Sequence, residues 1–118
     1  MKILLDSCVP YRAGEFFVGR DVTHASDIGF QNLRNGELIA RAALRFEALI
    51  TTDKKIRYEQ NLAKLALPVL ELNTRFTRLD DLRALIPHLQ SALDATREYL
   101  FISVRPDGTL EKLGERAK

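Results

Sequence analysis

The sequence is poor in cysteine and lacks long apolar runs. Its 118 residues include one cysteine, Cys8, so no disulfide can form within the chain, which agrees with a reducing compartment. The uninterrupted apolar stretches are far too short to span a bilayer. Asp6 interrupts the N-terminal apolar run before a signal peptide is formed. We therefore expect a cytoplasmic protein without a membrane segment.

A strong charge of either sign is also lacking. Eighteen Lys and Arg stand against sixteen Asp and Glu, for a net charge of +2, so any contact with nucleic acid must come from local clustering of basic residues. The two histidines, His24 and His88, fall on separate predicted elements, which argues against a shared histidine metal site. The chain also has no Gly-rich phosphate loop.

What the sequence does contain is the composition of one folded domain. Hydrophobic residues make up 46% and charged residues 29%, as in ordinary globular proteins, and the length suffices for a core without disulfides. There is no internal repeat, low-complexity segment or linker. We therefore expect a single domain over residues 1–118.

Short apolar runs that end in polar residues alternate with segments of helical periodicity. Such runs predict buried strands, and their alternation with helices predicts parallel βαβ units with right-handed crossovers. The expected strands are residues 2–5, 21–25, 48–52, 69–72 and 99–104. Three of the expected helices are residues 11–18, 54–65 and 79–96, and Pro87 would kink or break the last of them. A fourth helix is expected to be capped by Asn35 and to have its apolar face within residues 38–46. The Asp107-Gly108 pair predicts the turn of a C-terminal hairpin within residues 99–113.

Three acidic residues stand where such a fold brings distant segments together. Asp6 and Asp53 each follow a strand-like run, and Glu37 opens a helix. Ligand sites in parallel sheets lie outside the carboxyl ends of the strands. Three carboxylates within about 5 Å repel by about 3 kcal/mol per pair at an effective dielectric constant of 20, and Mg²⁺ or Mn²⁺ would compensate that repulsion. The pattern favours a metal site for phosphodiester hydrolysis.

Each acid also has a structural interpretation. Asp53 could cap the helix that follows it, and Glu37 could simply pair with Arg41 in the first turn of its helix. Asp6 has no comparable structural role, so it is the strongest of the three candidates.

Basic and amide side chains near the predicted edge are candidates for contacts with substrate. Phosphate contacts position a nucleic-acid backbone, and Phe30, Tyr58 or Phe76 could stack on bases. Solvated surface charges, core packing and satisfaction of loop backbone groups are the competing interpretations. The substrate-binding candidates are Arg34, Lys54, Arg57, Asn61 and Asn73.

Three motifs follow one another along the chain. Residues 2–10 read KILLDSCVP and resemble the ILLDENLP opening of the small PIN-like proteins, a family of domains of unknown function linked to toxin-antitoxin toxins. Residues 35–38 read NGEL, as at the start of a helix in that family, and residues 51–62 read TTDKKIRYEQNL and resemble its TTDxNLRYQQNL segment. The resemblance extends from residue 2 to about residue 104.

The resemblance implies a three-layer α/β/α PIN-like fold with a mainly parallel central sheet. It also implies a Mg²⁺- or Mn²⁺-dependent ribonuclease that cleaves single-stranded RNA, with Asp6, Glu37 and Asp53 as catalytic metal ligands. The setting would be the toxin of a toxin-antitoxin pair, with an antitoxin protein as partner and a homodimer as the expected assembly.

Two alternatives remain open at the level of sequence. PIN nucleases usually assemble four acids, and only three stand here, so the chain could be a catalytically idle PIN-like module that binds RNA or a protein. A flavodoxin-like signalling domain shares the order of elements and would use Asp53, but it would need a lysine after a later strand, and we rank it last.

Overall fold

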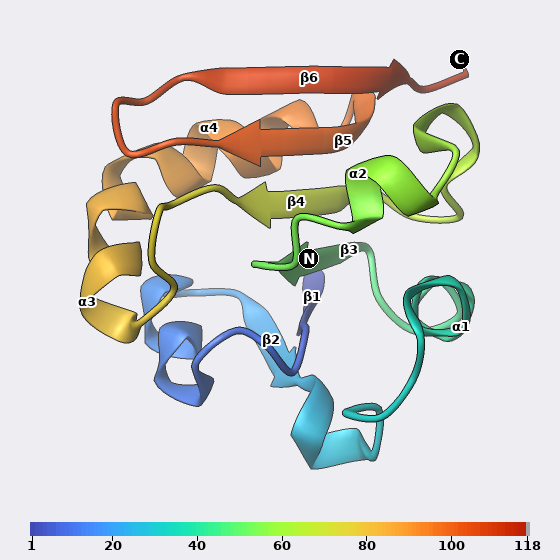
Figure 1. The fold of residues 1–118 in the computed structure, drawn as a ribbon, viewed down its shortest axis with the longest axis horizontal. Helices are drawn as coiled ribbons and strands as arrows, with labels where there is room; N and C mark the ends of the chain where they lie inside the picture. Colours follow the sequence, from blue (N-terminus) through green and yellow to red (C-terminus); the bar gives the residue numbers. More distant parts are fainter. Residues whose placement is uncertain (118) are drawn as a thin grey trace.

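The computed structural model describes residues 1–117 and shows a mixed α/β fold around a six-stranded sheet (Figure 1). The strands are β1 (Lys2–Leu5), β2 (Asp21–His24), β3 (Ala48–Thr51), β4 (Val69–Leu72), β5 (Tyr99–Val104) and β6 (Leu110–Glu115). Their order is β2-β1-β3-β4-β5-β6, with the first five parallel and β6 antiparallel to β5. The prediction of a mainly parallel sheet is thus confirmed.

The helices are shorter than the sequence pattern indicates. Residues 1–117 form α1 (Asn35–Ala42), α2 (Ile56–Glu59), α3 (Leu79–Leu82) and α4 (Leu89–Ala95), together with 3₁₀ helices at Tyr11–Phe16, Ala25–Ile28, Leu62–Lys64 and Arg83–His88. The predicted helix at 54–65 is wrong in its extent, because Gln60 is extended and ends α2. The predicted helix at 79–96 is divided by a 3₁₀ segment containing Pro87, which cannot donate a backbone hydrogen bond. None of the helices in residues 1–117 has the length and apolar character needed to cross a membrane.

Alternate residues of the buried strands feed two apolar clusters, one on each face of the sheet. Ile50 and Ile102 belong to the cluster covered by α3, α4 and the 3₁₀ helix at Tyr11–Phe16. Leu49 and Phe101 belong to the opposite cluster, which includes buried residues of α1 and α2. Both faces of the sheet therefore pack against helices, as the ribbon shows (Figure 1).

The face that carries α1 and α2 changes character towards the carboxyl ends of the strands. Two residues beyond the apolar positions on this face, polar side chains lie side by side across the sheet, and we call them the polar row. The strand pairing aligns Thr51 with Glu71, Glu71 with Ser103, and Ser103 with Glu111, while Asp6 follows the end of β1. Thr51, Glu71 and Ser103 are completely buried. The polar row therefore needs internal partners or a ligand.

The C-terminal hairpin places β6 at the edge of the sheet. Its turn uses Gly108 at a φ of +90°, in the left-handed region that glycine favours, and the Arg105 N–H donates to the Thr109 carbonyl over 3.0 Å. Gly114 also has a positive φ, and a Cβ there would collide with the carbonyl oxygen of Leu62. This close approach explains why β6 can lie against the 3₁₀ helix at Leu62–Lys64.

Candidate functional site

Asp6 and Asp53 lie at the carboxyl ends of neighbouring strands. Asp6 follows β1, and Asp53 stands two residues after the end of β3. The chain first adds β2 on one side of β1 and then β3 on the other, so β1 and β3 flank the point where the strand order reverses. Ligands of open α/β sheets bind at such points, and the order 2-1-3-4-5 is shared with flavodoxin-like folds. The fold therefore indicates where a ligand site would lie, but it does not indicate which reaction the site supports.

The hydroxyl of Thr51 connects the two aspartates. Thr51 Oγ1 donates to Asp6 Oδ2 over 2.8 Å and accepts the backbone N–H of Asp53 over 2.9 Å. The other oxygen of Asp6, Oδ1, accepts the Ser7 N–H at 2.7 Å. The backbone N–H of Asp6 is bound to the Ile50 carbonyl at 2.8 Å. Sheet and side-chain hydrogen bonds together hold the two acids next to each other.

The start of α1 is attached to the same site through Asn35. Asn35 was predicted as the residue that caps α1, but the helix begins at Asn35 itself, after Arg34, and its side chain has another use. Asn35 Nδ2 donates to Asp53 Oδ2 at 3.2 Å and to Glu59 Oε1 at 3.3 Å. Asp53 Oδ1 accepts the Lys55 N–H at 2.8 Å in the turn before α2. Asp53 does not cap that helix, because α2 begins at Ile56 after Lys55.

Asp6 and Asp53, which we call the acid pair, have no counterion among residues 1–117. Within residues 1–117, neither Asp6 nor Asp53 forms an ion pair, although Asp6 is only 7% exposed. Buried charges in proteins are normally paired with an opposite charge or bound to a metal. Carboxylate oxygens are preferred ligands of Mg²⁺, which is commonly held by one or two carboxylates and keeps several waters when it binds. The residues present therefore fit a hard divalent cation.

Glu37 stands in the first turn of α1, and its carboxylate pairs with a residue of the same helix. Its Oε1 lies 2.9 Å from Arg41 Nη2, and both side chains are about half exposed. No group of three or more His, Cys, Asp or Glu side chains within residues 1–117 has the arrangement needed to hold a metal. Of the three predicted acids, the structure thus joins Asp6 and Asp53 and leaves Glu37 in a surface ion pair.

Cys8 lies in the loop after β1, in contact with Thr51. The Sγ atom is 3.4 Å from Thr51 Oγ1. Desolvation, followed by the negative charge of Asp6, raises the pKa of the Cys8 thiol. A raised pKa reduces the thiolate fraction at neutral pH, so Cys8 is a poor candidate for a nucleophile.

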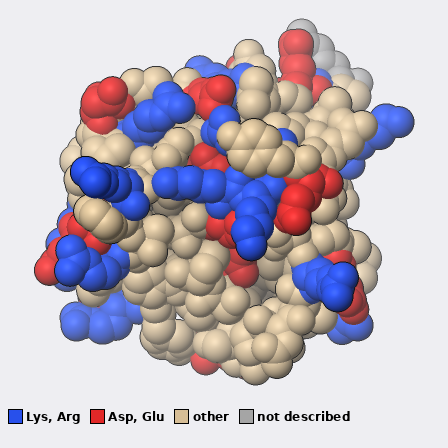
Figure 2. All heavy atoms as spheres, viewed as in Figure 1, with Lys and Arg blue, Asp and Glu red and all other residues tan. Residues whose placement is uncertain are grey.

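The predicted substrate-binding residues have different surroundings. Arg34 is exposed before α1, whereas Lys54 Nζ donates to the Thr74 carbonyl at 2.7 Å. Asn61 Oδ1 accepts the Ala63 N–H and caps a 3₁₀ helix, and Asn73 Nδ2 donates to Ser103 Oγ. Figure 2 shows Lys and Arg side chains gathered at the centre of the face that carries α2, with carboxylates beside them.

Arg57 belongs to a second cluster on the polar row, which sequence reasoning did not identify. Arg57 Nη2 lies 3.0 Å from Glu71 Oε1 and 2.8 Å from Glu111 Oε1, and only the contact with Glu71 has the alignment of a hydrogen bond. Ser103 Oγ also donates to Glu71 Oε1 at 2.7 Å. The hydrogen bond to Glu71 is the main reason why the pKa of Arg57 is raised. This arrangement makes Arg57 a structural residue.

One signal in the sequence could have revealed this cluster. Glu71 interrupts an otherwise apolar run in what had to be a central strand, and a buried carboxylate requires a partner. The identity of that partner was not visible, because Arg57 belongs to a different element.

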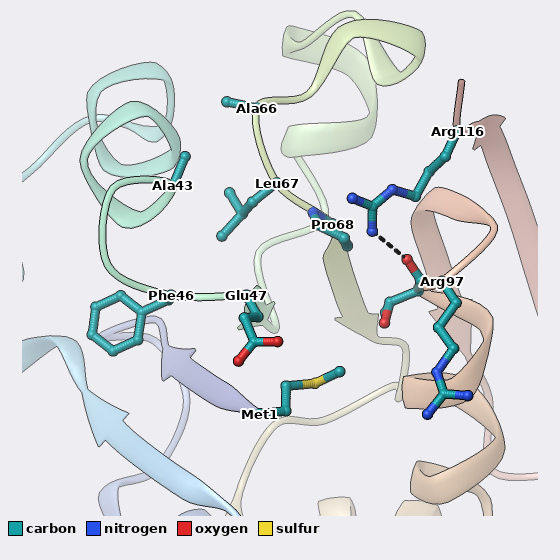
Figure 3. Close-up of a pocket in the computed structure, with 10 residues that line it drawn as sticks. Met1, Ala43, Phe46, Glu47, Ala66, Leu67, Pro68, Arg97 and Arg116 are labelled. Atoms are coloured by element: carbon teal, nitrogen blue, oxygen red, sulfur yellow. Dashed lines mark hydrogen bonds between the residues drawn. The ribbon is translucent and has the colours of Figure 1, made fainter. Parts of the chain in front are cut away.

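A cavity of about 500 Å³ lies at the opposite edge of the sheet, near the amino ends of β1, β3 and β4 (Figure 3). Met1, Phe46, Glu47, Arg97 and Arg116 are among its lining residues. Two of its charged groups already have local partners, because Arg116 Nη1 donates to the Thr96 carbonyl and Glu47 Oε1 accepts the Lys2 N–H. Asp6 and Asp53, in contrast, lie at the carboxyl ends of neighbouring parallel strands, where ligands of open sheets bind, and are therefore the stronger candidate site.

Comparisons with protein-family models, with curated proteins and with solved structures gave no match. The candidate function therefore rests on the residues and contacts of this chain.

Proposed function

We propose that this chain is a small PIN-like domain, with the three-layer α/β/α arrangement, that hydrolyses single-stranded RNA with the help of Mg²⁺ or Mn²⁺. The observation that carries the proposal is the pair of neighbouring aspartates, one of them buried, that meet at Thr51 without a cation among residues 1–117. The resemblance of three sequence motifs to small PIN-like proteins supports the same chemistry.

In this proposal each residue of the site has a distinct role. Asp6 and Asp53 hold the ion, and Thr51 fixes the orientation of Asp6 by donating to Oδ2. The bound ion would supply an activated water and would stabilise charge that develops on a phosphoryl oxygen. Glu37 would complete the ligand set, directly or through water, after leaving Arg41, since an exposed ion pair of this kind contributes only about 0.5 kcal/mol. Arg34 and Lys54 would position the phosphate backbone, and Arg57 would maintain the fold.

The proposal is tested by Asp6→Asn, with Asp21→Asn as the matched control. Asp21 is an exposed aspartate at the amino end of β2, on the opposite edge of the sheet from Asp6. Cleavage of a labelled single-stranded RNA in Mn²⁺ should fall at least about a hundredfold in Asp6→Asn, because a metal ligand is removed, and should be unchanged in Asp21→Asn. Undiminished cleavage by a folded Asp6→Asn protein would refute the assignment.

Thermal denaturation with MnCl₂ tests metal binding independently of activity. A ligand that binds only the folded state at a hundred times its Kd stabilises that state by about 2.7 kcal/mol. The wild-type chain and Asp21→Asn should gain this stability, and EDTA should reverse it. Asp6→Asn and Asp53→Asn should gain much less. Equal gains in all four proteins would show that Mn²⁺ binds elsewhere.

The ion pair between Glu37 and Arg41 favours a second candidate function. If Glu37 never leaves Arg41, the chain has two acids where PIN nucleases usually assemble four, and it would be an idle PIN-like module that binds RNA or a protein partner. Stabilisation by Mn²⁺ without RNA cleavage, in both the wild type and Arg41→Ala, would select this alternative.

The proposed biological setting is the toxin half of a toxin-antitoxin pair, with an antitoxin protein as partner. A small DNA-binding protein encoded by the neighbouring reading frame, which suppresses cleavage when it is mixed with this chain, would support that setting. A homodimer in solution is the assembly that we expect, and it can be measured by light scattering.

A further inference from the structure

The segment that joins β4 to α3, residues 73–78, presents an aromatic ring to solvent. Phe76 is 55% exposed, and the Arg75 guanidinium carbon lies 5.3 Å from the centre of its ring. An arginine stacked on an aromatic ring forms a flat, positively charged surface. We call Arg75 and Phe76 the stacking platform. The cores on the two faces of the sheet do not include this ring.

The stacking platform is attached to the acid pair by a side chain. Lys54, the residue after Asp53, donates from Nζ to the carbonyl of Thr74 at 2.7 Å. Thr74 is itself buried, and its hydroxyl donates to the carbonyl of Phe76. The backbone N–H of Asn73 donates to the Val104 carbonyl at 2.9 Å, which ties the start of the segment to β5. The position of the stacking platform relative to Asp53 is therefore defined by successive hydrogen bonds.

We propose that the stacking platform binds an unpaired base of single-stranded RNA and thereby positions the neighbouring phosphodiester at Asp6 and Asp53. This inference rests on the proposed function and adds the feature that selects the substrate. The faces of bases within a duplex are covered by their neighbours, whereas an unpaired base can stack on an aromatic ring or on a guanidinium plane. The exposed Lys55 lies next to Lys54 and can contact the backbone phosphates of the same strand.

Binding is measured without metal, so that cleavage plays no part. Fluorescence anisotropy of a short labelled oligouridine in EDTA should show about tenfold weaker binding by Phe76→Ala, which removes one base-stacking contact. Phe76→Tyr keeps the ring and should bind like the wild type. Phe76→Leu keeps apolar bulk without the ring and should bind as weakly as Phe76→Ala.

The matched control is Leu44→Ala, which removes an 85% exposed apolar side chain that lies between α1 and β3, far along the chain from the platform. Leu44→Ala should bind oligouridine like the wild type. The wild-type chain should bind a duplex of the same length more weakly than the single strand. In Phe76→Ala, the difference between the two affinities should be smaller.

Equal binding by Phe76→Ala and Leu44→Ala would overturn the stacking proposal, and so would a duplex that binds as tightly as the single strand. Neither result bears on the nuclease proposal, because that proposal is tested separately by the cleavage activity of Asp6→Asn in Mn²⁺. Conversely, Asp6→Asn should bind oligouridine in EDTA at least as well as the wild type, because it removes a negative charge without touching the stacking platform.

Discussion

Two carboxylates of the polar row are buried in opposite ways. In the middle of the row, Glu71 is completely buried and is bound by Arg57 and Ser103. At the β1 end of the row, Asp6 is almost as buried, and its side-chain partners are a hydroxyl and a backbone N–H. The two carboxylates face the same side of one sheet, so the difference lies in the partners and not in the fold.

This difference separates a structural carboxylate from one that is available to a ligand. The cost of burying Glu71 is offset by a guanidinium that the chain itself provides, so Glu71 has no need of an external partner. Among residues 1–117, the hydrogen-bond donors to the carboxylates of the acid pair are neutral backbone, hydroxyl and amide groups. A cation from solution can therefore reduce the cost of holding these negative charges. Substituting the partners of each carboxylate in turn tests this difference between Glu71 and Asp6.

The largest effect is expected when Arg57 is removed. Arg57→Ala leaves Glu71 as an unpaired buried charge and should lower the free energy of unfolding by about 3 kcal/mol. Urea denaturation measures the change. Arg41→Ala is the control, because its ion pair with Glu37 is exposed and should contribute about 0.5 kcal/mol or less.

A second substitution tests whether the loss comes from the charge of Glu71. Combining Arg57→Ala with Glu71→Gln removes the unpaired charge, so the double variant should recover part of the lost stability. If Arg57→Ala is no more destabilising than Arg41→Ala, then Arg57 does not compensate the buried charge of Glu71.

A smaller effect is expected from Thr51→Val, which removes the hydroxyl between the two aspartates and keeps the shape of the side chain. Asp6 loses a charge-assisted hydrogen bond and the Asp53 N–H loses its acceptor, so the free energy of unfolding should fall by about 2 kcal/mol. Urea denaturation again provides the measurement. Thr51→Ser, which keeps the hydroxyl, should be less destabilising and should still respond to Mn²⁺.

The neighbouring Thr52 supplies the matched control for that experiment. Its hydroxyl donates to the carbonyl of Cys8 over a longer 3.3 Å, and no charge is involved. Thr52→Val should therefore cost about 1 kcal/mol. Equal losses of stability in Thr51→Val and Thr52→Val would mean that the hydrogen bonds of Thr51 to the two aspartates are no stronger than the neutral hydrogen bond of Thr52.

The smallest effect is expected at Cys8, the single thiol of the chain. The charge of Asp6 contributes to the raised pKa of Cys8, so Asp6→Asn should lower that pKa and increase the thiolate fraction at mildly alkaline pH. The rate of alkylation by iodoacetamide, followed as a function of pH, should then rise at lower pH than in the wild type. Asp21→Asn should leave the profile unchanged, and a profile that is the same in all three proteins would show that the charge of Asp6 does not reach the thiol.

The strands were predictable because burial on both faces leaves a simple pattern. Short, continuous apolar runs such as residues 2–5 and 69–72 end in polar residues, and parallel strands between two layers of helices require such runs. The turn at Asp107-Gly108 was equally visible, since it depends on local backbone preferences.

The helices were less predictable, because their lengths depend on contacts with other elements. The periodicity of residues 54–65 favours one helix, yet α2 ends at Glu59 after a single turn, and Asn61 caps a separate 3₁₀ helix. Arg57 on this turn is held by strands β4 and β6. A pattern that is read along one segment contains no information about such partners.

For the candidate site, the positions of two residues in the fold were predictable from the sequence, and their contacts were not. Strand ends identified Asp6 and Asp53, because the carboxyl ends of parallel strands meet at one edge. The role of Thr51 depends on the register of β1 against β3, which sequence does not state. Glu37 illustrates the limit most clearly, since a residue in the first turn of a helix can face either the site or a neighbour on its own helix.

The adjacency of β1 and β3 has a mechanical consequence. Residues 7–47, which include β2, connect β1 to β3, so the border between β1 and β3 divides the sheet into β2-β1 on one side and β3 to β6 on the other. Asp6 follows β1 on one side of that border, and Asp53 follows β3 on the other. Any ligand that engages both of them also clamps the two halves together, and it should slow the spontaneous opening of the domain as well as raise its stability.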